Sequence, residues 1–125
     1  MREIEKEDVE FRVSCLEEAM PVRGNATASG DPEFDREVED EIIAKLDGGN
    51  PWAWCCVKVE AIFSTEDAPY VGEAYLGGCS YEDEDDFTAH SGYYEGLCEE
   101  ALDDLNRKLR SLNRKLRSLE RRLAG

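Results

Sequence analysis

The chain has 125 residues, which is enough for one modest hydrophobic core and an appendage. Thirty Asp and Glu residues against fifteen Lys and Arg residues give a formal net charge of −15 at pH 7. This charge excludes general binding of DNA or RNA, which depends on Lys and Arg displacing counterions from phosphates, and it argues against anionic membrane surfaces. It favours a cationic partner, although solubility alone explains an acidic surface equally well.

No apolar run reaches the ~18 residues that a membrane span needs. The first ten residues, MREIEKEDVE, also lack the apolar region of a signal peptide. We therefore expect no membrane partner and a cytoplasmic location.

Cysteine spacing indicates structural thiols. The five cysteines are Cys15, Cys55, Cys56, Cys79 and Cys98. Thiols stay reduced in the cytosol, and an odd number of them does not suggest a set of disulfides. Neither a CxxC nor an HxxxH spacing, which would indicate a zinc site, occurs in the sequence. We expect no bound metal and no cofactor.

The first half of the chain predicts a strand followed by a helix. Apolar and polar side chains alternate over residues 9–15, as in a half-buried strand. Turn-forming residues fill 21–31. Asp31 can cap a helix that begins at Pro32 and ends at Gly48. The predicted apolar stripe of this helix consists of Phe34, Val38, Ile42 and Leu46.

Two strands are predicted in the middle of the chain, joined by a turn. Residues 52–63 are rich in aromatic and β-branched side chains, and 70–81 form the returning strand. One face of the first strand is apolar throughout: Ala53, Cys55, Val57, Val59, Ala61 and Phe63. Gly72, Gly77 and Gly78 interrupt the second strand and indicate a bulge or the close approach of another backbone.

A long helix is predicted from Gly92 to the end of the chain, about 30 residues or roughly 45 Å. The order β-α-β-β-α indicates an α+β fold with a small antiparallel sheet, two packed helices and a C-terminal extension as a coiled coil. Two parts differ in charge. Residues 1–104 form an acidic head with a net charge of −22, and 105–125 form a basic helix with a net charge of +7.

The C-terminal helix carries a seven-residue repeat in which LNRKLRS occurs twice. Its leucines occupy every a and d position of a coiled coil: Leu102, Leu105, Leu109, Leu112, Leu116, Leu119 and Leu123. We therefore expect a homo-oligomer, with a dimer favoured by symmetry statistics. A parallel pair sets Lys115 against Glu120 of the partner, whereas an antiparallel pair opposes cations. Alternatively, the basic helix lies against an acidic face of its own head or of a neighbouring one.

Candidate catalytic groups are weak. The acidic run Glu82–Asp86 lacks the spaced ligands and the glycine of a calcium loop, which favours a solvated loop. His90 is the only histidine and fits no catalytic arrangement that the sequence can single out, so we interpret it as a loop residue. Leu76–Cys79 does not continue into the lysine and helix of a phosphate-binding loop. The chain is therefore not expected to be an enzyme.

Trp52 and Trp54 lie on the second face of the predicted strand 52–63. Tryptophan is a frequent anchor of interfaces, so the pair is a possible aromatic recognition surface. The favoured alternative is that the C-terminal helix or the loop 16–30 covers both rings as a second small core.

Four strings resemble sequences of small, uncharacterised accessory proteins that tailed bacteriophages and prophages encode. They are PVRGNATASGD at 21–31, NPWAWCCVKVEA at 50–61, YLGGCSYEDEDDF at 75–87 and GYYEGLCEEALDDL at 92–105. The resemblance covers residues 21–105. It implies an accessory protein that acts in the cytoplasm of the bacterial host, and it carries no catalytic residues with it.

The charge pattern and the resemblance lead to one main functional hypothesis. An acidic phage protein would inhibit a basic host protein, one with a nucleic-acid-binding groove and a role in defence, by presenting carboxylates in place of phosphates. The predicted carriers are Asp35, Glu39, Asp40, Glu41, Glu82, Asp83, Glu84, Asp85 and Asp86. The alternative is an assembly protein that works through its coiled coil. A nucleotide-binding role for the two tryptophans ranks last, because the head would repel phosphates.

Overall fold

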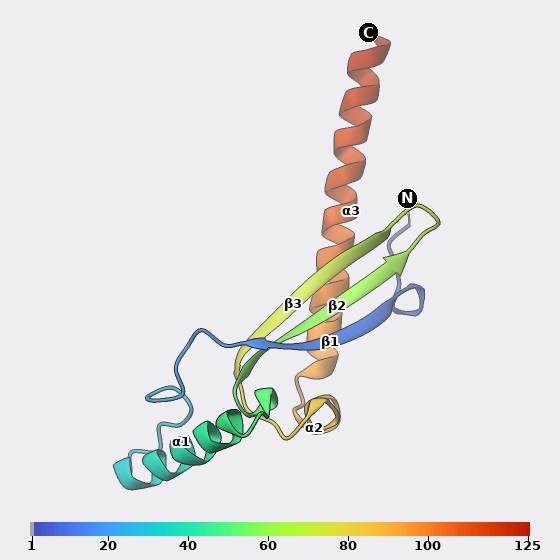
Figure 1. Cartoon of the computed structure of the whole chain (residues 1–125). Helices are drawn as coiled ribbons and strands as arrows, with labels where there is room; N and C mark the ends of the chain where they lie inside the picture. Colours follow the sequence, from blue (N-terminus) through green and yellow to red (C-terminus); the bar gives the residue numbers. More distant parts are fainter. Residues whose placement is uncertain (1) are drawn as a thin grey trace. The chain divides into compact units, whose positions relative to one another are not determined.

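The structure is a computed structural model, and it describes residues 2–125. In this part of the chain the fold is α+β, with a three-stranded antiparallel sheet in the order β1-β2-β3 and three α-helices (Figure 1). The strands are β1 Glu10–Glu17, β2 Cys55–Ser64 and β3 Pro69–Cys79. The helices are α1 Pro32–Asp47, α2 Glu84–His90 and α3 Tyr94–Ala124. The predicted fold class and the long C-terminal helix are confirmed.

The chain divides into two compact units. The α3 unit contains the residues up to Arg12, Val59–Ala74 and Cys98–Gly125. The α1–α2 unit contains Val13–Lys58 and Tyr75–Leu97. The α1–α2 unit holds 16 of the 30 carboxylates but only 4 of the 15 cations, so it carries a net charge of −12.

The apolar face predicted for the central strand is confirmed as far as Ala61, after which Ile62 is buried and Phe63 is partly exposed. Cys55, Val57, Val59 and Ala61 are buried, and the residues between them are partly exposed. The strand begins three residues later than predicted, because Pro51–Ala53 forms a 3₁₀ turn. The Asn50 side chain accepts a hydrogen bond from the Trp52 amide at 3.1 Å and caps that turn.

The predicted start and end of α1 are confirmed. The Asp31 carboxylate accepts hydrogen bonds from the amides of Glu33 and Phe34 at 3.1 and 3.4 Å, and Gly48 follows the last turn. Phe34 does not belong to the buried stripe, because 51% of its surface is exposed. The stripe begins instead at Val38, one turn later, and Ile42 is its buried centre.

The acidic run predicted as a loop is largely a helix, so that prediction was wrong. Asp83 caps α2, since its carboxylate accepts the Asp86 amide hydrogen bond at 2.8 Å. Three carboxylates in the first turn then lie near the positive end of the helix dipole, which stabilises them there. His90 is the last residue of this helix, and its Nδ1 lies 3.2 Å from Asp86 Oδ1.

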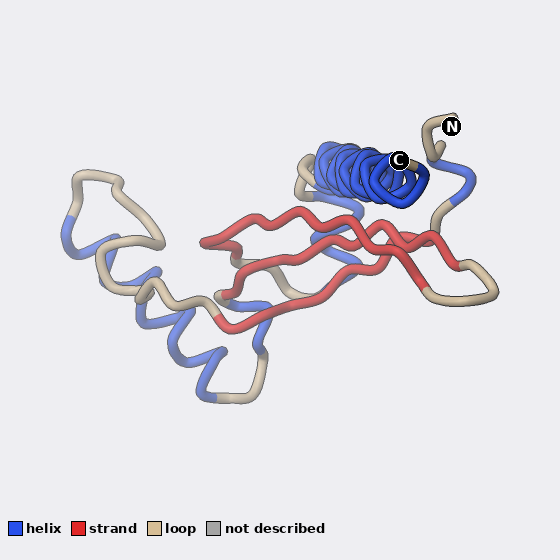
Figure 2. Tube along the Cα trace, turned by 90° about the horizontal axis from the view of Figure 1, so that it is seen from above, coloured by secondary structure: helices blue, strands red, loops and turns tan. Residues whose placement is uncertain are grey.

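In the α3 unit, α3 packs beside the strands at backbone distance (Figure 2). Ala101 and Leu105 are fully buried. A Cβ atom on Gly72 of β3 would lie 2.1 Å from the carbonyl oxygen of Ala101 and 2.4 Å from the amide nitrogen of Leu105. Only glycine permits this separation, so the close approach expected at Gly72 is confirmed.

Ile4, near the N-terminus, is hydrogen-bonded to α3 through the buried side chain of Asn106. The Ile4 amide donates to Asn106 Oδ1 at 2.8 Å, and Asn106 Nδ2 donates to the Ile4 carbonyl at 3.0 Å. Asn106 exposes 6% of its surface, and these two hydrogen bonds give both its amide oxygen and its amide nitrogen a partner inside the unit. An ion pair between Arg110 and Glu3 adds a second link.

The Asp104 carboxylate links α3 to β3. Its carboxylate accepts the Glu73 amide at 2.8 Å and lies 2.9 Å from Lys108 Nζ and 3.0 Å from an Arg107 guanidinium nitrogen. Burial alone would raise its pKa, but the hydrogen bonds from Lys108, the Glu73 amide and Arg107 hold the pKa down at about 2.

We predict that Asp104→Asn removes part of the acid sensitivity of the fold. A carboxyl group with a lowered pKa stabilises the folded state above its ordinary pKa of 3.8, and this contribution is lost as the pH falls through the folded-state pKa of about 2. The variant should therefore be less stable than the parent at pH 7, and the difference should disappear below pH 2. Urea unfolding at several pH values measures the difference. Asp103→Asn, at an exposed neighbouring position, should leave the pH profile of the parent unchanged.

Candidate acidic binding surface

The structure brings the two predicted acidic segments together within the α1–α2 unit. Lys45 of α1 lies 3.5 Å from a carboxylate oxygen of Glu82 and 3.5 Å from one of Glu41. Asn50 Nδ2 also donates to the Glu82 carbonyl at 3.1 Å. These contacts place the start of the acidic run at the C-terminal end of α1.

A row of glutamates runs along the exposed side of α1 toward this junction. Glu33, Glu37 and Glu41 are exposed and follow one another at four-residue intervals, which correspond to about 6 Å each. Like charges at this spacing destabilise a helix. We call the acidic surface the set formed by this row and the acidic run: Glu33, Glu37, Glu41, Glu82, Asp83, Glu84, Asp85 and Asp86.

Three of the predicted binding carboxylates belong to a different contact, and for Glu39 the prediction of an outward position was wrong. Glu39 exposes only 8% of its surface and accepts the Gly24 amide at 2.7 Å and an Arg23 guanidinium nitrogen at 3.3 Å. Arg23 also contacts Asp40 at 2.5 Å. Asp35 accepts the Ser29 hydroxyl at 2.6 Å, and this hydrogen bond lowers the pKa of Asp35.

These carboxylates hold the loop 21–31 against α1. The spacing of residues in α1 could have predicted that Asp35 and Glu39 are not outward-facing, a signal that the sequence-based assignment did not use. Asp35 and Glu39 flank Val38 and Ile42 on the helix surface, so they share the edge of the buried stripe. The loop then supplies the donors that a buried carboxylate requires.

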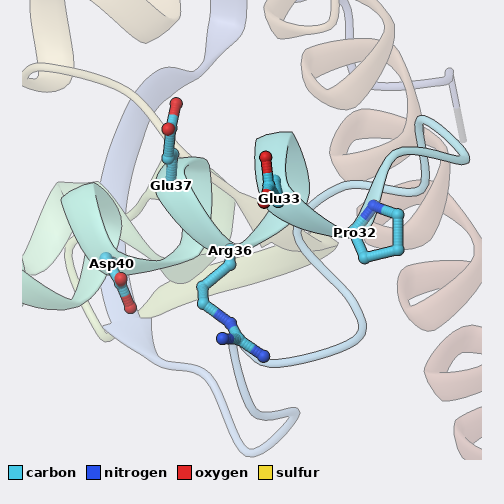
Figure 3. A pocket seen from close by; sticks show the side chains of 5 residues that line it. All are labelled: Pro32, Glu33, Arg36, Glu37 and Asp40. Carbon is cyan, nitrogen blue, oxygen red and sulfur yellow. The ribbon is translucent and has the colours of Figure 1, made fainter.

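An open hollow of about 390 Å³ lies beside the glutamate row, lined by Pro32, Glu33, Arg36, Glu37 and Asp40. Figure 3 shows Glu33 and Glu37 pointing to one side of α1, and Arg36 and Asp40 pointing to the other. Apart from Pro32, the lining side chains are three carboxylates and one guanidinium, so the hollow is a charged surface feature.

The predicted aromatic surface is wrong for Trp54. The residue exposes 7% of its surface, and its Nε1 donates to the Met20 carbonyl at 2.7 Å. Trp54 packs in a small core with Val22, Ile42 and Ala53. The loop after β1 therefore covers it together with α1, in agreement with the alternative interpretation that a loop over 16–30 does so. Trp52 is half-buried, with its ring centroid 6.0 Å from that of Phe87.

Buried thiols gather on neighbouring strands of the same unit. Burial raises the pKa of the Cys55 thiol strongly, and a hydrogen bond with Cys15 adds to the effect. Burial likewise raises the pKa of Cys79 and of Cys56. These groups stay protonated at neutral pH and are poor nucleophiles. Among residues 2–125, no three His, Cys, Asp or Glu side chains are grouped as a metal site requires.

The leucines of α3 divide into a packed set and an exposed set. Leu105 exposes 1% of its surface because it packs on Gly72, so its predicted role in oligomerisation is wrong. Leu102 and Leu109 are partly buried. The leucine seam, as we name the exposed set, consists of Leu112, Leu116, Leu119 and Leu123, with exposed fractions of 41, 50, 54 and 88%.

The helices between residues 2 and 125 include none that is both long enough and apolar enough to span a membrane. Comparison of the chain with known protein families, with curated proteins and with solved structures finds no match.

Proposed function

We propose that the protein is a non-enzymatic, acidic binding module that occupies the nucleic-acid-binding groove of a basic protein. The main observation in support is the contact between Lys45 and Glu82, which joins the glutamate row of α1 to the acidic run in one acidic surface. A basic groove binds nucleic acid through many weak contacts with phosphates. A continuous field of carboxylates competes for the same Lys and Arg side chains.

The glutamate row itself favours a binding role over solubility. Solubility requires net charge but no particular spacing. Three glutamates at four-residue intervals each repel the next, at roughly 0.2–0.5 kcal/mol per pair. The helix dipole near Glu33 and the Lys45 partner of Glu41 offset part of this repulsion. The regular spacing, which solubility does not require, supports a use for the charges in that arrangement.

The resemblance of the strings at 21–31, 50–61, 75–87 and 92–105 to phage accessory proteins supplies the proposed setting. In that setting the partner is a host defence protein in the bacterial cytoplasm. The acidic surface and loop 21–31 both lie in the region of this resemblance, whereas the leucine seam lies outside it.

We predict that Glu33→Lys, Glu37→Lys and Glu41→Lys together reduce partner capture at least tenfold, because the row changes from attraction to repulsion. Each side chain is exposed and lysine is a good helix former, so the fold should persist. The tagged protein is used to capture proteins from host lysate at about 0.05 M and 0.5 M salt, and bound proteins are quantified by mass spectrometry. The partner of the parent should be a nucleic-acid-binding protein and should be lost at high salt.

The matched control is Glu99→Lys, Glu100→Lys and Asp103→Lys, which changes the net charge by the same amount on exposed positions of α3. It should retain capture. Equal loss in both triple variants would show that only total charge matters. Capture that survives reversal of the row would contradict the proposal and leave the acidity as a solubility feature.

The second candidate function is assembly, and the exposed leucine seam favours it. A homo-oligomer, with a dimer as the expected size, would bury the seam in a C-terminal coiled coil. Assembly would also present several acidic surfaces in one particle and so increase avidity for a basic partner.

A further inference from the structure

The leucine stripe of α3 serves two different surfaces along its length. Over its first heptads the stripe faces its own unit, where Leu105 packs on Gly72. The two positions that flank the stripe there are also occupied. Asn106 is paired with Ile4, and Lys108 Nζ donates to the Val71 carbonyl at 3.3 Å. A second helix therefore cannot pair with α3 in this region.

The stripe is exposed from Leu112 onward. The C-terminal part of α3, red in Figure 1, extends beyond the turn that joins β2 and β3. The seam keeps the alternating three- and four-residue spacing, and exposure increases toward the C-terminus. The helix carries Arg, Lys, Asn and Ser around a narrow leucine stripe, which is the pattern of a coiled-coil seam.

We propose that the leucine seam pairs in parallel and in register with the same segment, residues 112–124, of a second copy of the chain. The inference rests on the assembly function proposed above. It adds which residues pair, which molecule they pair with, and that the two helices run in the same direction. Charge complementarity carries the direction. In a parallel pair the g residue Lys115 lies opposite the e residue Glu120 of the partner copy, twice per dimer.

An antiparallel pair would instead bring g residues together, with Lys115 opposite Arg122 of the other copy.

The acidic remainder of the chain argues against an anionic membrane as the partner of the seam, because residues 1–104 carry a net charge of −22. Two heptads form a short coil, so the pairing should be weak and depend on protein concentration.

The test reverses the two interfacial charges separately and then combines the variants. Lys115→Glu and Glu120→Lys each turn two attractive pairs into two repulsive ones, and each should weaken self-association of the full chain roughly tenfold at low salt. Mixing the two variants should restore pairing. In each mixed dimer the glutamate introduced at position 115 faces the lysine introduced at position 120, and the unchanged Lys115 of one copy faces the unchanged Glu120 of the other. Analytical ultracentrifugation over a range of concentrations measures the parent, the two variants and their mixture.

Several outcomes would overturn the inference. Stronger association of Lys115→Glu would indicate an antiparallel pair, because the introduced carboxylate would then face Arg122. A parent that stays monomeric at every concentration but binds vesicles rich in phosphatidylglycerol would identify a membrane as the occupant. A parent that stays monomeric and does not bind these vesicles would also contradict the inference, because the seam would then have no partner copy. Capture of the basic partner by a parent that stays monomeric would show that this inference fails while the binding function stands, because the acidic surface is complete in one copy of the chain.

Discussion

Gly72→Ala is expected to unfold a large part of the α3 unit. The added Cβ atom would lie 2.1 Å from the Ala101 carbonyl oxygen, a distance that real contacts do not reach. The colliding atoms belong to the helix backbone, so no side-chain rotation relieves the clash and α3 must move away from β3. Overpacking costs about 1–3 kcal/mol when side chains can adjust, and we expect at least the upper value here. Urea unfolding followed by circular dichroism measures it.

Gly96→Ala is the matched control for this substitution. Gly96 lies in the first turn of α3, and a Cβ atom there would meet nothing within 4 Å. Alanine should therefore stabilise the protein by about 0.5–1 kcal/mol through helix propensity. If Gly72→Ala unfolds at the same urea concentration as the parent, the backbone contact between α3 and β3 is absent in solution.

Trp54→Ala is expected to destabilise the α1–α2 unit by about 3–5 kcal/mol, the usual range for removing a buried aromatic ring. Trp54 packs on Ile42 of α1 and on Val22 of the loop, and its indole is fixed to Met20 by a hydrogen bond. The substitution should release the loop from α1 and reduce partner capture as well, because α1 carries the glutamate row. Thermal unfolding and the lysate assay measure the two effects.

Trp54→Phe separates the two contributions of this side chain. It keeps most of the apolar volume but loses the hydrogen bond to the Met20 carbonyl. The free energy of unfolding should fall by about 1 kcal/mol for the hydrogen bond, and somewhat further because the phenylalanine ring is smaller than the indole. A full loss of capture with Trp54→Phe at unchanged stability would contradict a purely structural role and return Trp54 to the binding surface.

Much of the fold could be predicted from local patterns. The alternation in 53–61 predicted the buried face of β2 because burial of a strand follows a period of two. Asp31, Pro32 and Gly48 predicted the ends of α1 because capping is a local property. The helix α2 was missed because its cap, Asp83, lies within a run of like charges that reads as solvated.

The candidate site was less predictable, since it depends on contacts between distant segments. The pairing of Glu39 with Gly24 and Arg23 requires the fold of loop 21–31, which composition does not specify. The same holds for Lys45 and Glu82, separated by 37 residues. Leu105 has the same pattern in the sequence as Leu112, and only the approach of Gly72 assigns them to different surfaces.

The duplicated heptad has a consequence for how far α3 reaches. Removing residues 112–118 would place Leu119 where Leu112 now stands, on the same side of the helix, because seven residues make almost two turns. The helix would shorten by about 10 Å, while the contacts of Gly72, Asn106 and Lys108 would be unaffected. The distance between the sheet and the last exposed leucine is therefore adjustable in steps of one repeat, independently of the surfaces at either end.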